Sequence, residues 1–243
     1  MPKILVCPIA FNENVKLKSV IERFLKSPAR KIADYLVMDD CSTDGTTEMI
    51  RSFAVQGVAT IRHEKQSGVG VAIRTAIRYA QKNQYDVIVI MAGNDKDNPD
   101  EITAVIKPIV DDGYDFVQGS RYKGKVGTGG DMPFYRKVAT RMHPMLMSFF
   151  TGASVTDSTN GFRAFRVKII DDRRIDLDQD WLDHYELEPY LMFKAIKLGY
   201  KFTEVFVTKI YPPKKLGYTK MKPLLGWWSI LKPLFYLGLG IKK

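Results

Sequence analysis

The first half of the chain alternates between short apolar runs and longer segments whose apolar positions recur at helical spacing. The apolar runs predict buried strands, and the segments between them predict helices. Such alternation is typical of a parallel sheet with right-handed crossovers, whose ligands bind at the carboxyl ends of the strands. The expected strands cover residues 3–10, 33–40, 58–64, 85–93 and 114–121, and the expected helices cover residues 14–25, 46–57, 69–83 and 99–113.

Two of these helices have an apolar stripe that predicts which of their faces is buried. Gly57 marks the end of one helix and Pro99 marks the beginning of another. The stripes consist of Val15, Val20, Ile21, Phe24 and Leu25 in the first expected helix, and of Ala72, Ile73, Ala76, Ile77 and Ala80 in the third.

After residue 122 the regular alternation loosens, and no internal repeat or low-complexity linker is found. Residues 123–131 are rich in glycine and predict a mobile loop. Residues 133–152 and 184–199 predict helices, residues 161–166 and 201–210 predict strands, and residues 211–222 form a basic loop. We therefore expect one domain over residues 1–222, followed by a tail over residues 223–243.

The composition is ordinary for a globular chain except for its charge. The 243 residues suit one large α/β domain, and the formal net charge of +10 implies attraction to an anionic partner. No RNA- or DNA-binding motif accompanies this charge, so nucleic acid is not expected as a partner. Cys7 lies within the first expected strand and Cys41 directly follows the second, and they indicate reduced core cysteines of a cytosolic protein. His63, His143 and His184 lack the spacing of a zinc site.

The C-terminal tail is strongly apolar and contains the paired Trp227 and Trp228. Lys232 and Pro233 interrupt the apolar stretch, whereas a spanning helix needs about 20 apolar residues. We interpret residues 223–243 as an amphipathic helix on a membrane surface, with packing on the core as the alternative. With the basic charge, this predicts a peripheral protein on the inner, cytoplasmic face of the membrane. Whether the tail contacts lipid or another subunit stays open, as does a homo-oligomer.

The sequence Val-Met-Asp-Asp at residues 37–40 ends the second expected strand. Asp39 and Asp40 can accept the N–H groups of a uracil or a guanine there, whereas Ser42, Thr43 or Asp44 can cap the next helix. Capping explains residues 42–46, but it does not explain two adjacent carboxylates at a strand end.

The order of these segments resembles the family 2 glycosyltransferases of the GT-A type, and most closely their branch of dolichyl- and polyprenyl-phosphate mannose synthases. Residues 10–13 and 39–46 are similar to the family segments "P-x-Y-N-E" and "V-D-D-x-S-x-D-G-T", and residues 66–76 to "N-x-G-x-G-x-A". The resemblance covers roughly residues 4–222 and implies a GT-A (Rossmann-like) α/β fold with a mostly parallel sheet. It also implies a nucleotide-diphosphate sugar donor carrying UDP or GDP, for which glycines let the backbone approach the nucleotide. The expected donor contacts are Pro8, Ala10, Phe11, Asn12, Glu13, Asp39, Asp40, Ser42, Gly68, Gly70, Ala92, Gly93 and Lys220.

The stretch Met-Ala-Gly-Asn-Asp-Lys-Asp-Asn-Pro-Asp at residues 91–100 departs from the family pattern "M-D-A-D-x-Q-H-P-P-E", whose side chains hold Mg²⁺ or Mn²⁺. Ala92, Asn94 and Lys96 stand at the three ligand positions. A hard divalent ion prefers anionic oxygens, and an ammonium group would repel it. One hypothesis is that Lys96 replaces the cation, so that no metal is needed. The other is that Asn94 and Asp95, or Asp97, still bind a metal, and a solvated turn is the simplest alternative.

The resemblance also implies a lipid-phosphate acceptor. It assigns Arg121 and Arg136 to the acceptor phosphate and Lys220 to the donor diphosphate. A polyprenyl phosphate is already anionic and needs no strong base, whereas a sugar or lipid hydroxyl needs a carboxylate to take its proton. The candidate bases are Glu186 and Glu188, with Asp157 behind them, and in-line displacement implies inversion of the anomeric configuration.

Three other classes of protein share some of these features. A sugar nucleotidyltransferase would need a basic glycine-rich loop after the first strand, where this chain has Ala-Phe-Asn-Glu-Asn. A basic nucleic-acid binder lacks a supporting motif, and an inactive GT-A-like nucleotide binder is conceivable because the metal ligands are replaced. We expect an inverting, membrane-associated glycosyltransferase acting on a polyprenyl phosphate or another lipid-linked acceptor.

Overall fold

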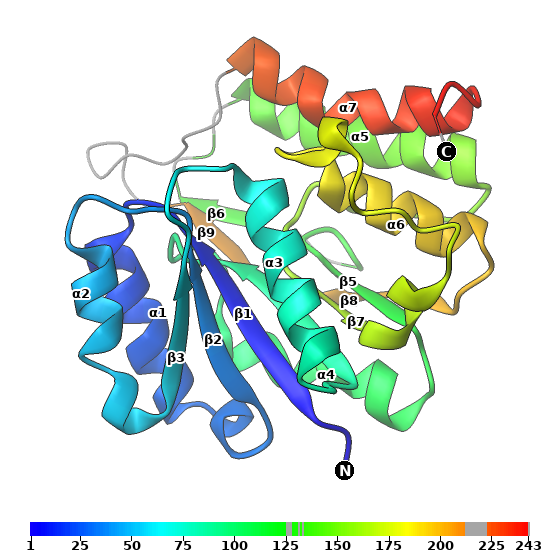
Figure 1. Cartoon of the computed structure of the whole chain (residues 1–243). Helices are drawn as coiled ribbons and strands as arrows, with labels where there is room; N and C mark the ends of the chain where they lie inside the picture. Colours follow the sequence, from blue (N-terminus) through cyan, green and yellow to red (C-terminus); the bar gives the residue numbers. More distant parts are fainter. Residues whose placement is uncertain (125–127, 131, 133, 212–222, 243) are drawn as a thin grey trace.

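The computed structural model describes residues 1–124, 128–130, 132, 134–211 and 223–242 (Figure 1). Its centre is a seven-stranded sheet in the order β3-β2-β1-β4-β7-β5-β8. Strand β7 is antiparallel to both of its neighbours, and the other pairings are parallel. The mostly parallel α/β sheet expected from the sequence is therefore confirmed. The strands are β1 (Ile4–Ala10), β2 (Asp34–Asp39), β3 (Val58–Arg62), β4 (Val87–Ala92), β5 (Phe116–Ser120), β7 (Arg163–Arg166) and β8 (Phe202–Phe206).

A second, two-stranded parallel sheet lies beyond the carboxyl ends of the main strands. It pairs β6 (Thr128–Gly130) with β9 (Lys209–Tyr211). The expected mobile loop over residues 123–131 is therefore wrong for residues 128–130, whose backbone bonds to β9. The single strand expected over residues 201–210 is divided into β8 and β9, because the chain leaves one sheet and joins the other.

Helices cover both faces of the main sheet. Helices α1, α2 and α4 pack on one face, and α3, α5, α6 and α7 contribute to the core on the other. The helices are α1 (Asn14–Lys26), α2 (Thr46–Arg51), α3 (Val69–Lys82), α4 (Ile102–Asp111), α5 (Phe134–Thr151), α6 (Leu187–Lys197) and α7 (Pro223–Gly238). Short 3-10 helices cover Pro28–Lys31, Ala54–Gln56, Pro99–Glu101, Val167–Asp171 and Asp180–Leu182.

The predicted apolar stripe of α3 is buried as expected, but one position of the α1 stripe is wrong. Val15 is 82% exposed, whereas Leu17 is fully buried. Two residues along a helix correspond to about 200°, so Val15 lies on the face opposite to Leu17. The helix expected over residues 46–57 ends at Arg51, and a 3-10 turn then leads to Gly57 in the left-handed region (φ 81°).

The C-terminal helix α7 packs against α5 and α6 (Figure 1). Ile230 and Leu234 are buried, and the Phe235 ring lies 5.9 Å from that of Phe150 on α5. Among the described residues, no helix combines the length and the apolar character needed to cross a bilayer. The separate role of residues 223–243 and their contact with a membrane stay predictions.

Candidate active site

A cavity of about 440 Å³ opens at the carboxyl ends of β1 and β4. These neighbouring strands lie where the strand order reverses, which is the usual ligand position in open α/β sheets. The volume suits a small-molecule ligand. Helices α5, α6 and α7 and strand β9 complete the wall. The charged side chains in the lining are Glu13, Lys16, Lys96, Arg121, Arg136, Glu188 and Lys209.

Lys96 is the most unusual of these side chains. The turn after β4 passes through Asp95 in the left-handed region (φ 60°) and directs Lys96 into the cavity lining. Lys96 is only 6% exposed, and its Nζ lies 5.3 Å from the ring centroid of Tyr211. Burial, reinforced by the nearby charges of Lys209 and Arg136, lowers the pKa of Lys96 to about 7. An anion bound beside it would raise this pKa again, so the amine would take up a proton from the solvent and become an ammonium.

Lys209 on β9 is fixed beside Lys96 by two oxygen atoms. Its Nζ donates to Asp97 Oδ1 at 2.6 Å and to Asn160 Oδ1 at 2.7 Å. The second Asp97 oxygen accepts the Ala92 N–H at 2.9 Å, and the Ile210 N–H donates to the Lys96 carbonyl at 3.1 Å. The turn after β4 and strand β9 are thus joined into one wall that presents both lysines.

The described residues do not form a carboxylate shell for a divalent ion. The Ala92 side chain has no ligand atom, Asp95 pairs with Arg23 of α1 and is absent from the cavity lining, and Asp97 is engaged by Lys209. Within the described part of the chain, no three His, Cys, Asp or Glu side chains gather into a metal-binding group. The hypothesis that Asn94 and Asp95 hold a metal together is therefore not supported by their positions. Asn94 lines the cavity, and its buried Oδ1 has no hydrogen-bond partner among the described residues.

Arg121 and Asp157 form a buried, bidentate ion pair. Arg121 Nε and Nη2 donate to the Asp157 carboxylate at 2.6 and 2.8 Å, and Arg121 Nη1 donates to the Tyr211 hydroxyl at 3.2 Å. Burial favours the neutral acid, but Arg121 holds the pKa of Asp157 below its usual range. Asp157 is thus engaged by Arg121 inside the protein, and its role as a base stays a prediction. Arg121 reaches the cavity, although Asp157 already balances its charge.

The two candidate bases at the beginning of α6 have different surroundings. Glu188 lines the cavity, with its Oε1 3.2 Å from Nη2 of Arg163. Glu186 instead contacts Lys232 of α7 at 2.7 Å and does not line the cavity. The structure therefore brings Glu188 to the site and leaves Glu186 as a link between α6 and α7.

The loop after β1 supplies one end of the cavity. Ala10, Phe11, Asn12 and Glu13 line it, whereas Pro8 is buried within the strand. The Asn12 N–H donates to Ser42 Oγ at 2.9 Å, and Asn12 Oδ1 accepts the Thr43 N–H at 2.8 Å. The loops after β1 and β2 are therefore interlocked.

Asp39 and Asp40 are bonded inside the protein. Asp39 is fully buried and accepts hydrogen bonds from Ser42 and Thr47. Asp40 accepts the N–H groups of Ser67 and Gly68, both at 2.9 Å. Neither carboxylate lines the cavity, so their contact with a nucleotide base stays a prediction.

The glycines at the beginning of α3 approach another part of the protein. A Cβ at Gly70 would lie 2.0 Å from the Leu182 carbonyl oxygen, and one at Gly68 would lie 2.5 Å from that of Asp183. Packing of the segment before α6 therefore explains both glycines, and their approach to a nucleotide stays a prediction. Gly93 is similarly close to the Ile9 carbonyl, at 3.0 Å.

The cavity contains several residues that were not predicted from the sequence, and one predicted residue lies outside the described part of the chain. Lys220 lies outside the described residues. No sequence signal identified a lysine within an apolar strand or a tryptophan in the tail as cavity residues. The missed lining residues include Lys16, Thr140, Thr159, Tyr185, Lys209, Tyr211, Trp227 and Ile230.

Known proteins resemble this chain in sequence and in fold. The sequence model of the family described as glycosyl transferase family 2 matches residues 6–174. Polyprenol monophosphomannose synthase of Mycolicibacterium smegmatis is 28% identical over 90% of this chain and 81% of its own length. Undecaprenyl-phosphate mannosyltransferase of Micrococcus luteus is 29% identical over 78% of this chain and 76% of its own length.

A solved structure extends the comparison of folds. Glucosyl-3-phosphoglycerate synthase from Mycobacterium tuberculosis, in complex with Mn²⁺, UDP and glucosyl-3-phosphoglycerate, has a TM-score of 0.66 at 17% identity. The match covers 100% of this chain and 81% of that one. At this identity the likeness concerns the fold alone, which is the GT-A α/β fold expected from the sequence.

Proposed function

The chain belongs to glycosyl transferase family 2 and is a glycosyltransferase, and from that premise we propose that it moves a sugar from a nucleotide-diphosphate sugar to a polyprenyl phosphate. Two relatives bear names that specify polyprenol or undecaprenyl-phosphate mannosylation, which supports this acceptor class. The observation that carries the proposal is the cavity at the ends of β1 and β4, where basic side chains outnumber carboxylates. Such a site suits the two phosphorylated substrates together.

The chemistry follows from the charges of the two substrates. One oxygen of the acceptor phosphate attacks the anomeric carbon while the bond from that carbon to the diphosphate breaks, which inverts the configuration. The attacking oxygen is already anionic, so this step transfers no proton. The leaving nucleoside diphosphate gains negative charge, and fixed positive groups stabilise it best when they are already in place. Lys96 and Lys209 supply those groups, and Arg121 and Arg136 contact the acceptor phosphate.

We propose that Lys96 replaces the divalent cation that accompanies the nucleotide in the solved relative. Support comes from the residues around it: Asp95 and Asp97 are held by Arg23 and Lys209, and no described carboxylate cluster is present. Burial strengthens the attraction between an ammonium and a diphosphate, because little water screens them. Asn94 Oδ1, buried without a partner among the described residues, suits a hydroxyl of the donor sugar.

A hydroxyl acceptor is a second candidate, favoured by one observation. Glu188 lines the cavity and could take a proton from a sugar or lipid alcohol. Its Oε1 lies 3.2 Å from Arg163 Nη2, which holds the carboxylate in place at the cavity wall. An alcohol acceptor would therefore depend on Glu188, whereas a phosphate acceptor would not.

The test is transfer from UDP- and GDP-sugars to undecaprenyl phosphate in detergent, with EDTA present throughout. The expected product is an undecaprenyl-linked sugar phosphate of inverted anomeric configuration, read by NMR, with release of one nucleoside diphosphate per transfer. Undecaprenol, which has a hydroxyl in place of the phosphate, serves as the matched acceptor. Transfer to undecaprenol that is lost in Glu188→Gln would establish the second candidate. If the protein neither hydrolyses any of the donors nor transfers sugar to either lipid, both candidates are contradicted.

The place of action is a further part of the proposal. The acceptor is a membrane lipid, so we place the protein peripherally on the inner face of the membrane. The sequence-based expectation of such a location rests on the basic charge and the Trp-rich C-terminal region.

A further inference from the structure

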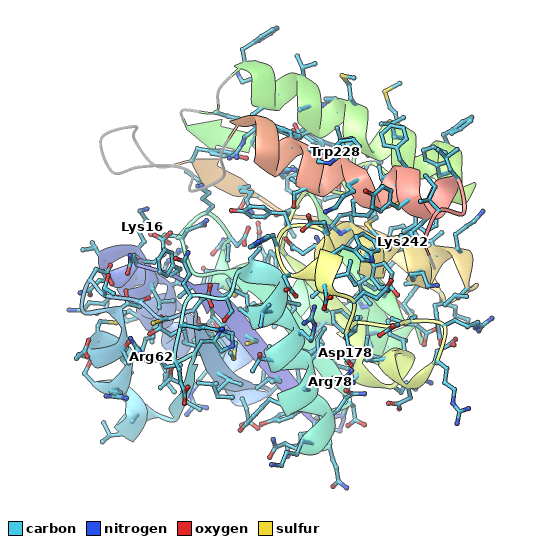
Figure 2. The ribbon with its side chains drawn as sticks, turned by 45° about the horizontal axis from the view of Figure 1, so that its top comes forward. Lys16, Arg62, Arg78, Asp178, Trp228 and Lys242 are labelled. Atoms are coloured by element: carbon cyan, nitrogen blue, oxygen red, sulfur yellow. The ribbon has the colours of Figure 1, made fainter. Side chains whose placement is uncertain are left out.

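Helix α5 exposes a continuous apolar stripe. Its large apolar side chains at positions separated by four, four, three and four residues lie on one helical face, and each is between 42% and 79% exposed. At 1.5 Å per residue the stripe is about 22 Å long. Figure 2 shows α5 at the outer edge of the molecule, with side chains pointing away from the sheet. The stripe consists of Phe134, Val138, Met142, Met145 and Phe149.

The neighbouring C-terminal segment adds to this apolar face. Trp228, Leu239 and Ile241 are each more than half exposed, and α7 packs alongside α5 (Figure 2). More than half of the exposed large apolar side chains of the described residues belong to these two helices and the three residues after α7. A concentration of this kind marks an interaction surface, whereas single exposed apolar residues are ordinary.

The charges beside the stripe are all of one sign. Neither α5 nor α7 contains an Asp or a Glu, although the whole chain has 27. Lys137 and Arg141 are exposed on α5, and Lys242 is exposed after α7. An apolar face flanked by basic residues and free of acidic ones is the pattern of a helix that lies in the interface of an anionic bilayer.

The same two helices also form the wall of the substrate cavity. Arg136 and Thr140 line it from α5, and Trp227 and Ile230 line it from α7. A lipid whose phosphate occupies the cavity could therefore keep its chain in a bilayer that touches the outer side of these helices. On α5, Arg136 and Thr140 are each two residues, or about 200°, from positions of the stripe, so one helix presents the cavity on one face and the apolar stripe on the other.

We propose that the α5 stripe, extended by the exposed C-terminal residues, is the surface that docks on an anionic lipid bilayer. The inference deepens the proposed function, since it specifies how the enzyme meets its lipid substrate, and it gives α5 the main role that the sequence assigned to residues 223–243. A second copy of this chain is the competing occupant. A symmetric dimer through this face would bring Lys137 and Arg141 of both copies together, and such like-charge contact is unfavourable.

Vesicle co-sedimentation of the full chain tests the proposal. The probes are vesicles of phosphatidylcholine with phosphatidylglycerol, and vesicles of phosphatidylcholine alone. The unmodified chain is expected to bind the anionic vesicles more tightly. The double variant Met145→Ser, Phe149→Ser should bind them at least about tenfold more weakly, because it removes two side chains from the apolar contact. Val15→Ser with Val55→Ser removes two exposed valines from other elements and should bind as the unmodified chain does.

A second variant, Lys137→Gln with Arg141→Gln, should reduce the preference for anionic vesicles without touching the stripe. All variants should retain nucleotide binding, since none of the changed residues lines the cavity. Equal vesicle binding by the unmodified chain and the stripe variant would overturn the proposal, as would absence of binding by the unmodified chain. A dimer in solution that the stripe variant dissolves would assign the face to a second copy. If the unmodified chain binds no nucleotide, that result would instead count against the proposed function.

Discussion

The Lys96 side chain is unusual in two respects: it is deeply buried, and several other positively charged side chains lie near it. In water a lysine at neutral pH is fully charged, but here burial and the charges of Lys209, Arg136 and Lys16 bring its pKa to about 7. A bound diphosphate adds negative charge and raises that pKa again. Donor binding therefore takes up a proton whenever the pH lies above the pKa of the empty site.

The sign of the resulting pH dependence is fixed. Below pH 7 Lys96 is protonated in both states and contributes no slope, whereas above pH 7 each increase in pH weakens donor binding. We expect UDP or GDP affinity to fall from pH 7 to pH 9, and calorimetry in buffers of different ionisation enthalpy to report proton uptake. Lys96→Arg, which stays protonated, should bind without this slope, and a slope of the same size in that variant would contradict the assignment to Lys96.

The pair Arg121–Asp157 illustrates a buried charge that depends on its partner. We expect Asp157→Asn to reduce the free energy of unfolding by about 3–5 kcal/mol, because Arg121 would remain charged, buried and without its counter-ion. Urea unfolding of the two proteins measures the difference. Asp178→Asn breaks the exposed pair with Arg78 and should change stability by about 1 kcal/mol or less. If the two substitutions change the free energy of unfolding by similar amounts, the buried Arg121–Asp157 pair matters no more to stability than an exposed pair.

At the scale of elements, His143 ties α5 to α7. Its Nε2 lies 3.1 Å from the Ile230 carbonyl, which can only accept, so Nε2 carries the proton and Nδ1 accepts from Ser158 Oγ at 2.6 Å. Burial lowers the pKa of His143 from 6.5 to about 4. The folded protein therefore favours the neutral ring more than the unfolded chain does.

This difference predicts acid sensitivity. Above pH 6.5 the contribution of neutral His143 is complete, and it is lost as the pH falls from 6.5 toward 4, where the unfolded chain binds the extra proton. We expect the urea midpoint to fall between pH 7 and pH 5, and to fall less in His143→Gln, which does not titrate. An equal decrease in the two proteins would place the acid sensitivity elsewhere.

The beginning of α3 makes a second link between elements. Gly70→Ala would place a Cβ 2.0 Å from the Leu182 carbonyl oxygen, so α3 and the segment before α6 must separate. We expect a loss of about 1–3 kcal/mol in the free energy of unfolding, as for other overpacked sites. Gly113→Ala meets no neighbour within 4 Å and has only the strain of φ +70°, so it should cost about 1 kcal/mol. A smaller effect at Gly70 than at Gly113 would contradict the close packing.

At the scale of the whole molecule, the alternation of strands and helices up to β5 could be predicted because it depends on local periodicity, whereas β6 and the division of β8 from β9 could not. The approach of Lys96 to the site could also be predicted, since the end of a parallel strand determines where the next turn lies. The partner of Asp97 could not, because Lys209 is 112 residues away in the sequence. Likewise, nothing local distinguishes Glu186 from Glu188, and only the position of α7 directs the first to Lys232.

The central claim is that buried lysine, and not a divalent ion, balances the donor diphosphate. Calorimetric titration of UDP and GDP into the unmodified chain and Lys96→Met, each with EDTA and with Mn²⁺, tests it most directly. Lys31→Met, at an exposed position outside the cavity, is the matched control. The account predicts binding of one nucleotide that survives EDTA, is little changed by Mn²⁺ and weakens at least about tenfold in Lys96→Met, for loss of a buried charge contact. Binding that occurs only with Mn²⁺, or that is unchanged in Lys96→Met, would contradict it.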